Sequence, residues 1–314
     1  MIRPYKILIK SKSQKYLVTI AIGSRVYQEW NIYALPLWKK YCKKNSIGLI
    51  VFDKNIIDKK NFYWKKPTWQ KMLLADSLIT FNEKVTDICY LDTDILINPN
   101  SPNIFDFHKR NKISVVSETY NLPFDLYRTK KKVSFFRNKY YSKKYPLDSS
   151  LFMSVKEKYR FHKFKPQKDY FCAGLIMFNL KAFSKTMKKW FFKYNKDQIT
   201  LTGGGDEPIM NFEIFNTKKV NILNYKFQAL WFYEMADKYS FLYNLKDKKN
   251  QLVKFCIEEA LMNNYFLHFP GSWYEGKMWK IKNILKNKIK TNYKLNSYIK
   301  RKSKGKPVGR IIPL

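Results

Sequence analysis

Acidic residues are scarce in this sequence of 314 residues. Only 24 Asp and Glu stand against 61 Lys and Arg, which gives a formal net charge of +37. Such an excess favours polyanions, anionic membrane surfaces or phosphate-bearing substrates as partners. The chain is also rich in Asn, Ile and Tyr, so a coding bias toward Lys is an alternative explanation, and charge alone does not identify the partner.

Paired cysteines are absent as well. The four cysteines lie far apart without a C-x-x-C spacing, and two of them, Cys89 and Cys172, have apolar neighbours. This usage is typical of reduced, buried thiols in a reducing compartment. We therefore expect a cytoplasmic protein.

Long apolar runs are also missing. No stretch approaches the roughly 20 apolar residues that a membrane span needs. The first apolar run, residues 16–22, is short and ends at Gly23 without a convincing cleavage site, so it is interpreted as a strand rather than a signal peptide. The protein should be soluble or peripheral to a membrane. The chain contains no internal repeat.

A hydrophobic content of 45% and an aromatic content of 18% are typical of a globular protein. Alternating strands and helices predict an α/β fold with a mostly parallel, Rossmann-like sheet flanked by helices, in which ligands bind beyond the carboxyl ends of the strands. The first expected strands cover residues 16–23, 47–52 and 86–97, and the first expected helices cover residues 28–44, where Pro36 starts or kinks the helix, and residues 69–82, with Thr68 as the cap.

The rest of the chain continues this pattern. Strands are expected at residues 113–117 and 170–180, and a basic amphipathic helix at residues 181–194. Asp206 is expected to cap a further helix with Pro208 in its first turn. Acids at such a position often only bind helix-terminal amides, which is the alternative to a role in a binding site.

A basic segment interrupts the pattern at about residues 118–168. Between Asp125 and Asp148 it holds eight basic residues and no acid, interleaved with aromatic residues. We interpret it as an insertion in the α/β domain. The alternative is a solvated basic loop or helix whose aromatic side chains turn inward.

A second basic segment ends the chain. Beyond Glu275 there are 13 Lys and Arg and no acid, and apolar residues recur at helical spacing from Met278 to Ile289. Residues 276–314 are therefore predicted to form a basic amphipathic helix and a tail. Residues 277–310 could contact an anionic membrane, because each basic residue near such a surface adds roughly 1 kcal/mol.

Two acids set two apart, Asp92 and Asp94, stand in the apolar run from Cys89 to Ile97. In one extended strand both side chains would project to the same side. Two adjacent carboxylates repel each other unless a positive charge lies between them, so a divalent metal is the economical explanation. The alternative is that the strand ends at Leu91 and the acids only form a turn.

Several motifs occur in an order that resembles nucleotide-sugar glycosyltransferases of the GT-A fold. The closest resemblance is to the glycogenin-like and lipopolysaccharide galactosyltransferase enzymes of glycosyltransferase family 8. It covers about residues 16–280 and implies a GT-A catalytic domain over residues 1–275. The motifs are Leu91-Asp92-Thr93-Asp94, Asn98-Pro99, Ile104-Phe105-Asp106, Cys172-Ala173-Gly174 before Phe178-Asn179-Leu180, Asp206-Glu207 after a glycine, and His268-Phe269-Pro270-Gly271 with Lys277 and Trp279.

The resemblance also implies roles for individual residues. Asp92, Asp94 and His268 would bind Mn²⁺, with Mg²⁺ as a substitute, because carboxylate, imidazole and phosphate oxygens suit these ions. Asp206, Glu207 and Lys277 would be the catalytic residues, with Lys277 neutralising the departing oxygen. The nucleotide sugar would contact Ala21, Ile22, Gly23, Tyr27, Lys71, Asp92, Thr93, Gly271 and Lys277. The sugar and acceptor side would be lined by Cys172, Ala173 and Gly174.

The predicted function is transfer of a sugar from a nucleotide-diphosphate sugar, with UDP-sugar as the expected donor, to a hydroxyl of a glycan or other acceptor, with retention of configuration. The alternative is a basic nucleic-acid-binding protein without catalytic activity, suggested by the charge of +37. Asp92 and Asp94 speak against that alternative, because without a metal they would repel phosphate.

Overall fold

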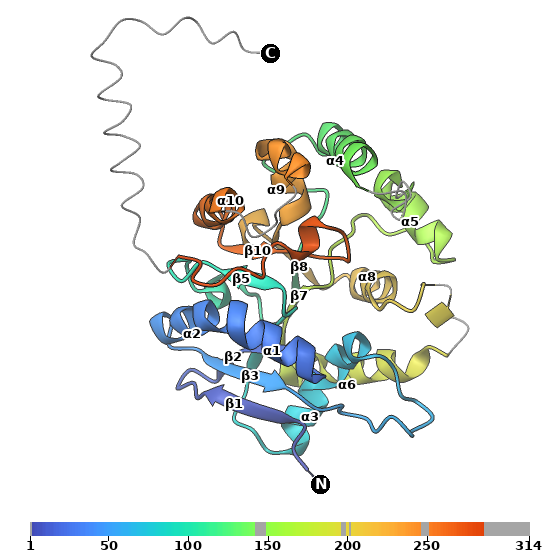
Figure 1. Ribbon diagram of the computed structural model, residues 1–314. Helices are drawn as coiled ribbons and strands as arrows, with labels where there is room; N and C mark the ends of the chain where they lie inside the picture. The colour runs from blue at the N-terminus through green and yellow to red at the C-terminus, as the bar shows by residue number, and fades with distance from the viewer. Residues whose placement is uncertain (1, 142–148, 196–198, 201, 246–250, 286–314) are drawn as a thin grey trace, which may run out of the picture.

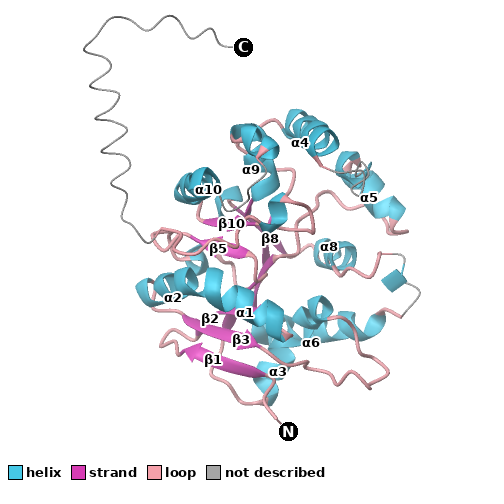
Figure 2. Cartoon of the chain, viewed as in Figure 1, coloured by secondary structure: helices cyan, strands magenta, loops and turns pink. Residues whose placement is uncertain are grey.

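The computed structural model describes residues 2–141, 149–195, 199–200, 202–245 and 251–285. Its centre is a seven-stranded sheet (Figures 1 and 2). In spatial order the strands are β1 (Tyr5–Ile9), β3 (Gly48–Phe52), β2 (Lys15–Ile20), β4 (Asp87–Leu91), β7 (Leu175–Asn179), β6 (Ile113–Val116) and β8 (Val220–Leu223).

Five of these strands, β2, β3, β4, β6 and β8, run in one direction, whereas β1 and β7 run the opposite way. The expected α/β sheet flanked by helices is confirmed. The antiparallel position of β7 between β4 and β6 was not predicted, since a buried apolar strand has the same composition in either direction.

Helices cover both faces of the sheet because the central strands are apolar on both sides. Leu17 and Val18 are neighbours in β2, yet they belong to two separate buried clusters. One cluster includes apolar residues of α1 (Ser24–Tyr33) and α2 (Leu35–Lys44). The other includes those of α3 (Leu74–Thr80) and α6 (Leu180–Lys193).

The helix predicted over residues 28–44 is two helices, α1 and α2, with Pro36 in the first turn of the second. The predicted break at this proline is confirmed, since proline lacks the amide that an interior helix position needs. Residues 69–82 differ from the expectation. There a 3₁₀ helix over Pro67–Leu73 precedes α3, and no side chain caps either element.

The remaining helices lie toward the carboxyl-terminal half. They are α4 (Leu126–Tyr140), α5 (Val155–Phe161), α8 (Glu207–Asn216), α9 (Trp231–Lys238) and α10 (Gln251–Asn263). Helices α4 and α5 form the described part of the predicted insertion, whose residues 142–148 lie outside the described ranges. None of the helices in the described ranges is long and apolar enough to cross a membrane.

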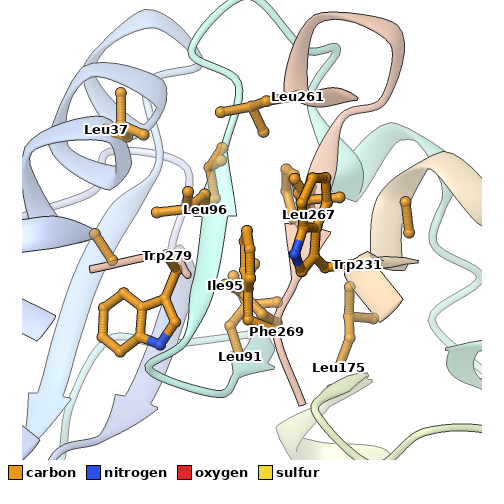
Figure 3. Close-up of a cluster of buried hydrophobic side chains, with 14 of the residues drawn as sticks. Leu37, Leu91, Ile95, Leu96, Leu175, Trp231, Leu261, Leu267, Phe269 and Trp279 are labelled. Atoms are coloured by element: carbon orange, nitrogen blue, oxygen red, sulfur yellow. The ribbon is translucent and has the colours of Figure 1, made fainter. Parts of the chain in front are cut away.

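A small second sheet, in the order β5 (Ile95–Ile97), β10 (Phe266–His268) and β9 (Ala229–Leu230), lies beside the large one. The single strand predicted over residues 86–97 is therefore wrong: β4 ends at Leu91, the chain turns, and β5 joins the second sheet. Apolar packing explains the turn, because β5 and β10 bury their side chains in the cluster shown in Figure 3.

The predicted helix from Met278 to Ile289 does not form in its described part, since residues 278–285 adopt turns. Trp279 and Ile284 are instead buried in the core. This packing attaches residues 278–285 to the core of the α/β fold. Residues 286–314, which include most of the predicted tail, lie outside the described ranges.

Candidate active site

The turn from Asp92 to Asp94 connects the two sheets and lies next to His268. Strand β5 pairs with β10 so that Ile95 stands opposite His268. The backbone amide of Phe269 also donates to the Asp94 carbonyl oxygen at 3.2 Å. The two acids therefore come together with the imidazole through strand pairing, and not through a shared extended strand.

The three side chains have the arrangement of a metal-ligand set. His268 Nε2 lies 3.3 Å from Asp94 Oδ1 and 3.8 Å from Asp92 Oδ2. Each residue offers one ligand atom, and these atoms lie within 4.8 Å of one another. Burial lowers the pKa of His268, but the carboxylates of Asp94 and Asp92 outweigh it, so the pKa is raised. The site therefore attracts positive charge.

Two ligand atoms have no other use in the described structure. His268 Nε2 and Asp94 Oδ1 are buried, and beyond their own contact at 3.3 Å neither has a hydrogen-bond partner among the described residues. Buried polar atoms without partners are costly, so such atoms call for an explanation. A divalent cation between them fits this donor set.

Gly174 lets a third segment approach the cluster. Its carbonyl oxygen accepts the Asp92 amide at 2.9 Å. A Cβ at this position would lie 2.3 Å from His268 Cε1 and 2.9 Å from Asp92 Oδ2. Only glycine therefore fits here without displacing two of the three candidate ligands.

Lys71 is buried behind the cluster and is 4% exposed. Its ammonium lies 2.9 Å from Asp206 Oδ2 and 4.0 Å from Asp92 Oδ1, and it donates to the Ala173 carbonyl oxygen at 2.8 Å. Burial lowers the pKa of Lys71, yet the two carboxylates outweigh burial and raise it. Asp206 precedes α8 as predicted, but its side chain makes no cap bond and pairs with Lys71 instead.

Two residues around the cluster were missed by the sequence analysis. Tyr90 donates from its hydroxyl to Asp92 Oδ1, and its position two residues before Asp92 was the available signal. Gln228 Nε2 lies 3.2 Å from His268 Nδ1 and 3.1 Å from the Cys172 carbonyl oxygen, and no motif points to it. Cys172 Sγ also lies 3.6 Å from His268 Nδ1.

A pocket of about 550 Å³ adjoins the cluster through Cys172. Its lining includes Glu118, Lys158, Tyr170, Glu207, Gly271 and Trp273. The Lys158 ammonium lies 2.9 Å from Glu118 Oε2 and 4.2 Å from the centre of the Tyr170 ring. Sequence analysis identified neither Glu118 nor Lys158, since both stand in irregularly patterned segments.

Glu207 is one of the carboxylic acids that line this pocket. Burial and the carboxylate of Glu118 raise its pKa to about 7, although the Lys158 ammonium acts in the opposite direction. The Glu207 carboxylate accepts the Ala173 amide at 3.2 Å. Glu118, Cys172 and Glu207 also bring one ligand atom each within 4.8 Å, but the Lys158 ammonium already supplies a positive charge there.

The other predicted residues lie around this network without a described contact to the three candidate ligands. Residues 21–23 follow β2, which pairs in parallel with β4, so they begin at the same edge of the sheet as Asp92. Tyr27 lies in α1, and its ring is 5.3 Å from the Lys6 ammonium. Thr93 lies in the turn between the two acids. Gly271 has a φ of 86°, and Lys277 is exposed in the 3₁₀ helix Glu275–Lys277.

The sequence model of glycosyl transferase family 8 matches residues 6–283, most of the chain. The chain belongs to glycosyltransferase family 8. It is therefore a glycosyltransferase of a nucleotide-sugar-dependent family, and this membership argues against the alternative of a nucleic-acid-binding protein without catalytic activity. No curated protein sequence matches this family 8 enzyme.

Solved glycosyltransferases are also similar to this family 8 enzyme. One is a glycosyltransferase involved in glycosylation of the major capsid of PBCV-1, with 9% identity, a TM-score of 0.49, and coverage of 85% of this chain and 97% of the other. Another is the galactosyltransferase LgtC in complex with donor and acceptor sugar analogues, with 12% identity, a TM-score of 0.46, and coverage of 94% and 98%.

Proposed function

We propose that this family 8 enzyme transfers a sugar from a UDP-sugar to a hydroxyl of a glycan or glycoconjugate, with Mn²⁺ held by Asp92, Asp94 and His268. The observation that carries the metal assignment is that two buried atoms, His268 Nε2 and Asp94 Oδ1, lie 3.3 Å apart and have no hydrogen-bond partner beyond this contact among the described residues. Mg²⁺ would substitute, because the set contains two carboxylates.

The transfer breaks the bond between the anomeric carbon and a diphosphate oxygen and forms a bond to the acceptor oxygen on the same face. The acceptor proton passes to the leaving diphosphate. A bound metal supplies Lewis-acid stabilisation of the diphosphate charge. Lys277 would donate to the leaving oxygen, and the positive φ of Gly271 would allow a backbone amide to approach the phosphates.

The nucleotide would bind along the turn at residues 21–23, with Tyr27 against the base. Support comes from the parallel pairing of β2 with β4, since ligands bind where parallel strands end. Thr93 and Lys71 belong to the same proposed site. Because Lys71 is buried and paired with Asp206, its proposed role is to hold Asp92 in place rather than to touch the nucleotide.

The acceptor would occupy the pocket lined by Glu118, Lys158, Glu207 and Trp273. A pocket of this size, with aromatic walls and a few buried charged groups, is typical of a small-molecule or sugar site. Cys172, Ala173 and Gly174 would separate it from the metal, and Asp206 and Glu207 would position the reacting sugar.

Thermal denaturation with UDP-, GDP- and CMP-sugars, each with and without Mn²⁺, tests the proposal. A ligand at 100 times its dissociation constant stabilises the native state by about 2.7 kcal/mol. We expect the largest rise with a UDP-sugar and Mn²⁺. Asp94→Asn should lose the part of this rise in melting temperature that depends on Mn²⁺. Asp106→Asn, the same change at an exposed position, should keep that part. Equal shifts with and without Mn²⁺ would refute the metal site.

A further inference from the structure

An exposed apolar surface lies away from the metal cluster, on the loop between β3 and α3 and on the groove beside it. Phe62 is 82% exposed, Tyr63 48% and Phe192 38%. The rings of Phe62 and Tyr63 are 5.2 Å apart, and those of Tyr63 and Phe192 are also 5.2 Å apart. Exposed side chains of this size are unusual when they are contiguous, and such patches mark interaction sites.

The surface continues from these aromatic rings into an aliphatic groove. Phe192 lines a groove of about 270 Å³ together with Ile2, Ile56 and Ile57. Ile2 is 81% exposed. We call the six residues Ile2, Ile56, Ile57, Phe62, Tyr63 and Phe192 the apolar face.

Lysines surround the apolar face. The segment 53–66 and helix α6, which supply five of its six residues, contain ten lysines and two aspartates. Nine of these lysines are exposed, Lys65 being the exception. Of the nearby acids, Asp53 pairs with Lys6 at 2.6 Å, and Asp76, which also lines the groove, pairs with Lys188 at 2.9 Å, which leaves Asp58 as the exposed acid of the segment 53–66.

This combination fits one class of partner. Aromatic side chains flanked by lysines are typical of protein segments that lie in the interface of an anionic bilayer. A nucleic acid would also bind lysines and stack on aromatic rings, but the three isoleucines offer nothing for a base to stack on. We propose that the apolar face docks on a membrane that contains anionic lipid, with the rings of Phe62 and Tyr63 at the level of the headgroups.

Docking there would bring the membrane near the proposed acceptor pocket. Trp69 Nε1, from the 3₁₀ helix that follows the loop, donates to the Gly204 carbonyl oxygen at 3.1 Å. Gly205 and Thr202 from the same glycine-rich turn line the pocket. Figure 1 shows this loop and α8 on the same side of the molecule. The docking surface is thus close to the site, yet none of its residues belongs to it.

Cosedimentation of the full-length chain with vesicles tests the proposal. Vesicles of phosphatidylcholine alone would be compared with vesicles that contain 30 mol% phosphatidylglycerol. The double variant Phe62→Ser/Tyr63→Ser should bind the anionic vesicles at least about tenfold more weakly than the unchanged chain, because burial of one aromatic side chain alone is worth such a factor. Lys59→Gln/Lys60→Gln should weaken binding to the anionic vesicles only.

Phe135→Ser is the matched control, because Phe135 is 58% exposed on α4 and is also flanked by lysines. It should bind as the unchanged chain does, and all variants should keep the same melting temperature. Equal binding by the Phe62 double variant and the unchanged chain would overturn the proposal, and so would equal binding of the unchanged chain to both vesicle types. A defect of the double variant in self-association or in RNA binding, with vesicle binding intact, would assign the face to those partners instead. None of these outcomes depends on the nature of the sugar donor.

Discussion

Replacing Lys71 by Met should destabilise the protein strongly, because it breaks a buried charge network. The Lys71 side chain is 4% exposed and that of Asp206 8%, and their charged atoms are 2.9 Å apart. Methionine keeps much of the side-chain volume but leaves Asp206 unpaired and removes the hydrogen bond to the Ala173 carbonyl. Removal of one partner from a buried pair costs about 3–5 kcal/mol, so we expect a loss in that range.

Urea denaturation at pH 8, followed by tryptophan fluorescence, measures this loss. Lys188→Met is the control, because Lys188 pairs with Asp76 at the same distance of 2.9 Å but with 48% and 36% of the side chains exposed. Exposed ion pairs contribute at most about 1 kcal/mol, so the free energy of unfolding of this variant should differ from that of the unchanged protein by no more than this amount.

Two further results would separate the charge effect from simple loss of packing. The loss caused by Lys71→Met should shrink as the pH falls, because protonation removes the unpaired charge of Asp206. The double variant Lys71→Met/Asp206→Leu should recover at least half of the stability that Lys71→Met loses, since apolar replacements of buried ion pairs are well tolerated. A loss below about 1 kcal/mol for Lys71→Met, or one that does not change with pH, would refute the reasoning.

Three other predictions concern the pocket and the metal cluster. The pKa of Glu207 is raised to about 7 in the folded protein, so the folded state keeps a proton that the unfolded state loses above the ordinary pKa of 4.5. The free energy of unfolding should therefore fall as the pH rises from 4.5 to 7. In urea denaturation Glu207→Gln should be more stable than the unchanged protein by up to ~3 kcal/mol at pH 8, and by little at pH 4.5. Gly174→Ala should displace His268 and Asp92, and calorimetric titration should then detect no Mn²⁺ binding while circular dichroism shows a folded protein. Gln228→Leu should weaken Mn²⁺ binding about 10–100-fold in the same titration, because the outer nitrogen of a ligating histidine needs a polar partner, and Gln228→Glu should restore most of it.

Those parts of the fold were predictable whose signals are local. Short apolar strands, the break before Pro36 and the helix start at Asp206 each follow from neighbouring residues. The turn at Asp92 was not, since apolar residues continue on both sides of it and only pairing with β10 reveals the change of sheet. The antiparallel direction of β7 is likewise a property of topology rather than of its residues.

The candidate site also contains some residues that the sequence predicts and others that it does not. Asp92, Asp94 and His268 belong to sequence motifs that metal binding would explain, and the structure brings the three together. Glu118, Lys158 and Gln228 belong to no such sequence motif. They reach the pocket or the imidazole through packing of distant segments, since Glu118 and Lys158, like Gln228 and His268, are separated by 40 positions in the sequence. No spacing rule applies to such contacts.

The pairing of β5 with β10 also has a consequence for synthesis on the ribosome. The register places His268 opposite Ile95, so the last candidate ligand emerges long after the first two. Until β10 has been synthesised, β5 lacks its antiparallel neighbour in the second sheet. Strand β9 lacks its neighbour as well, because β10 lies between β5 and β9. A nascent chain that ends before β10 can fold much of the large sheet but exposes an unpaired apolar strand, the kind of segment that chaperones bind. Metal affinity should therefore appear only after β10 has been synthesised.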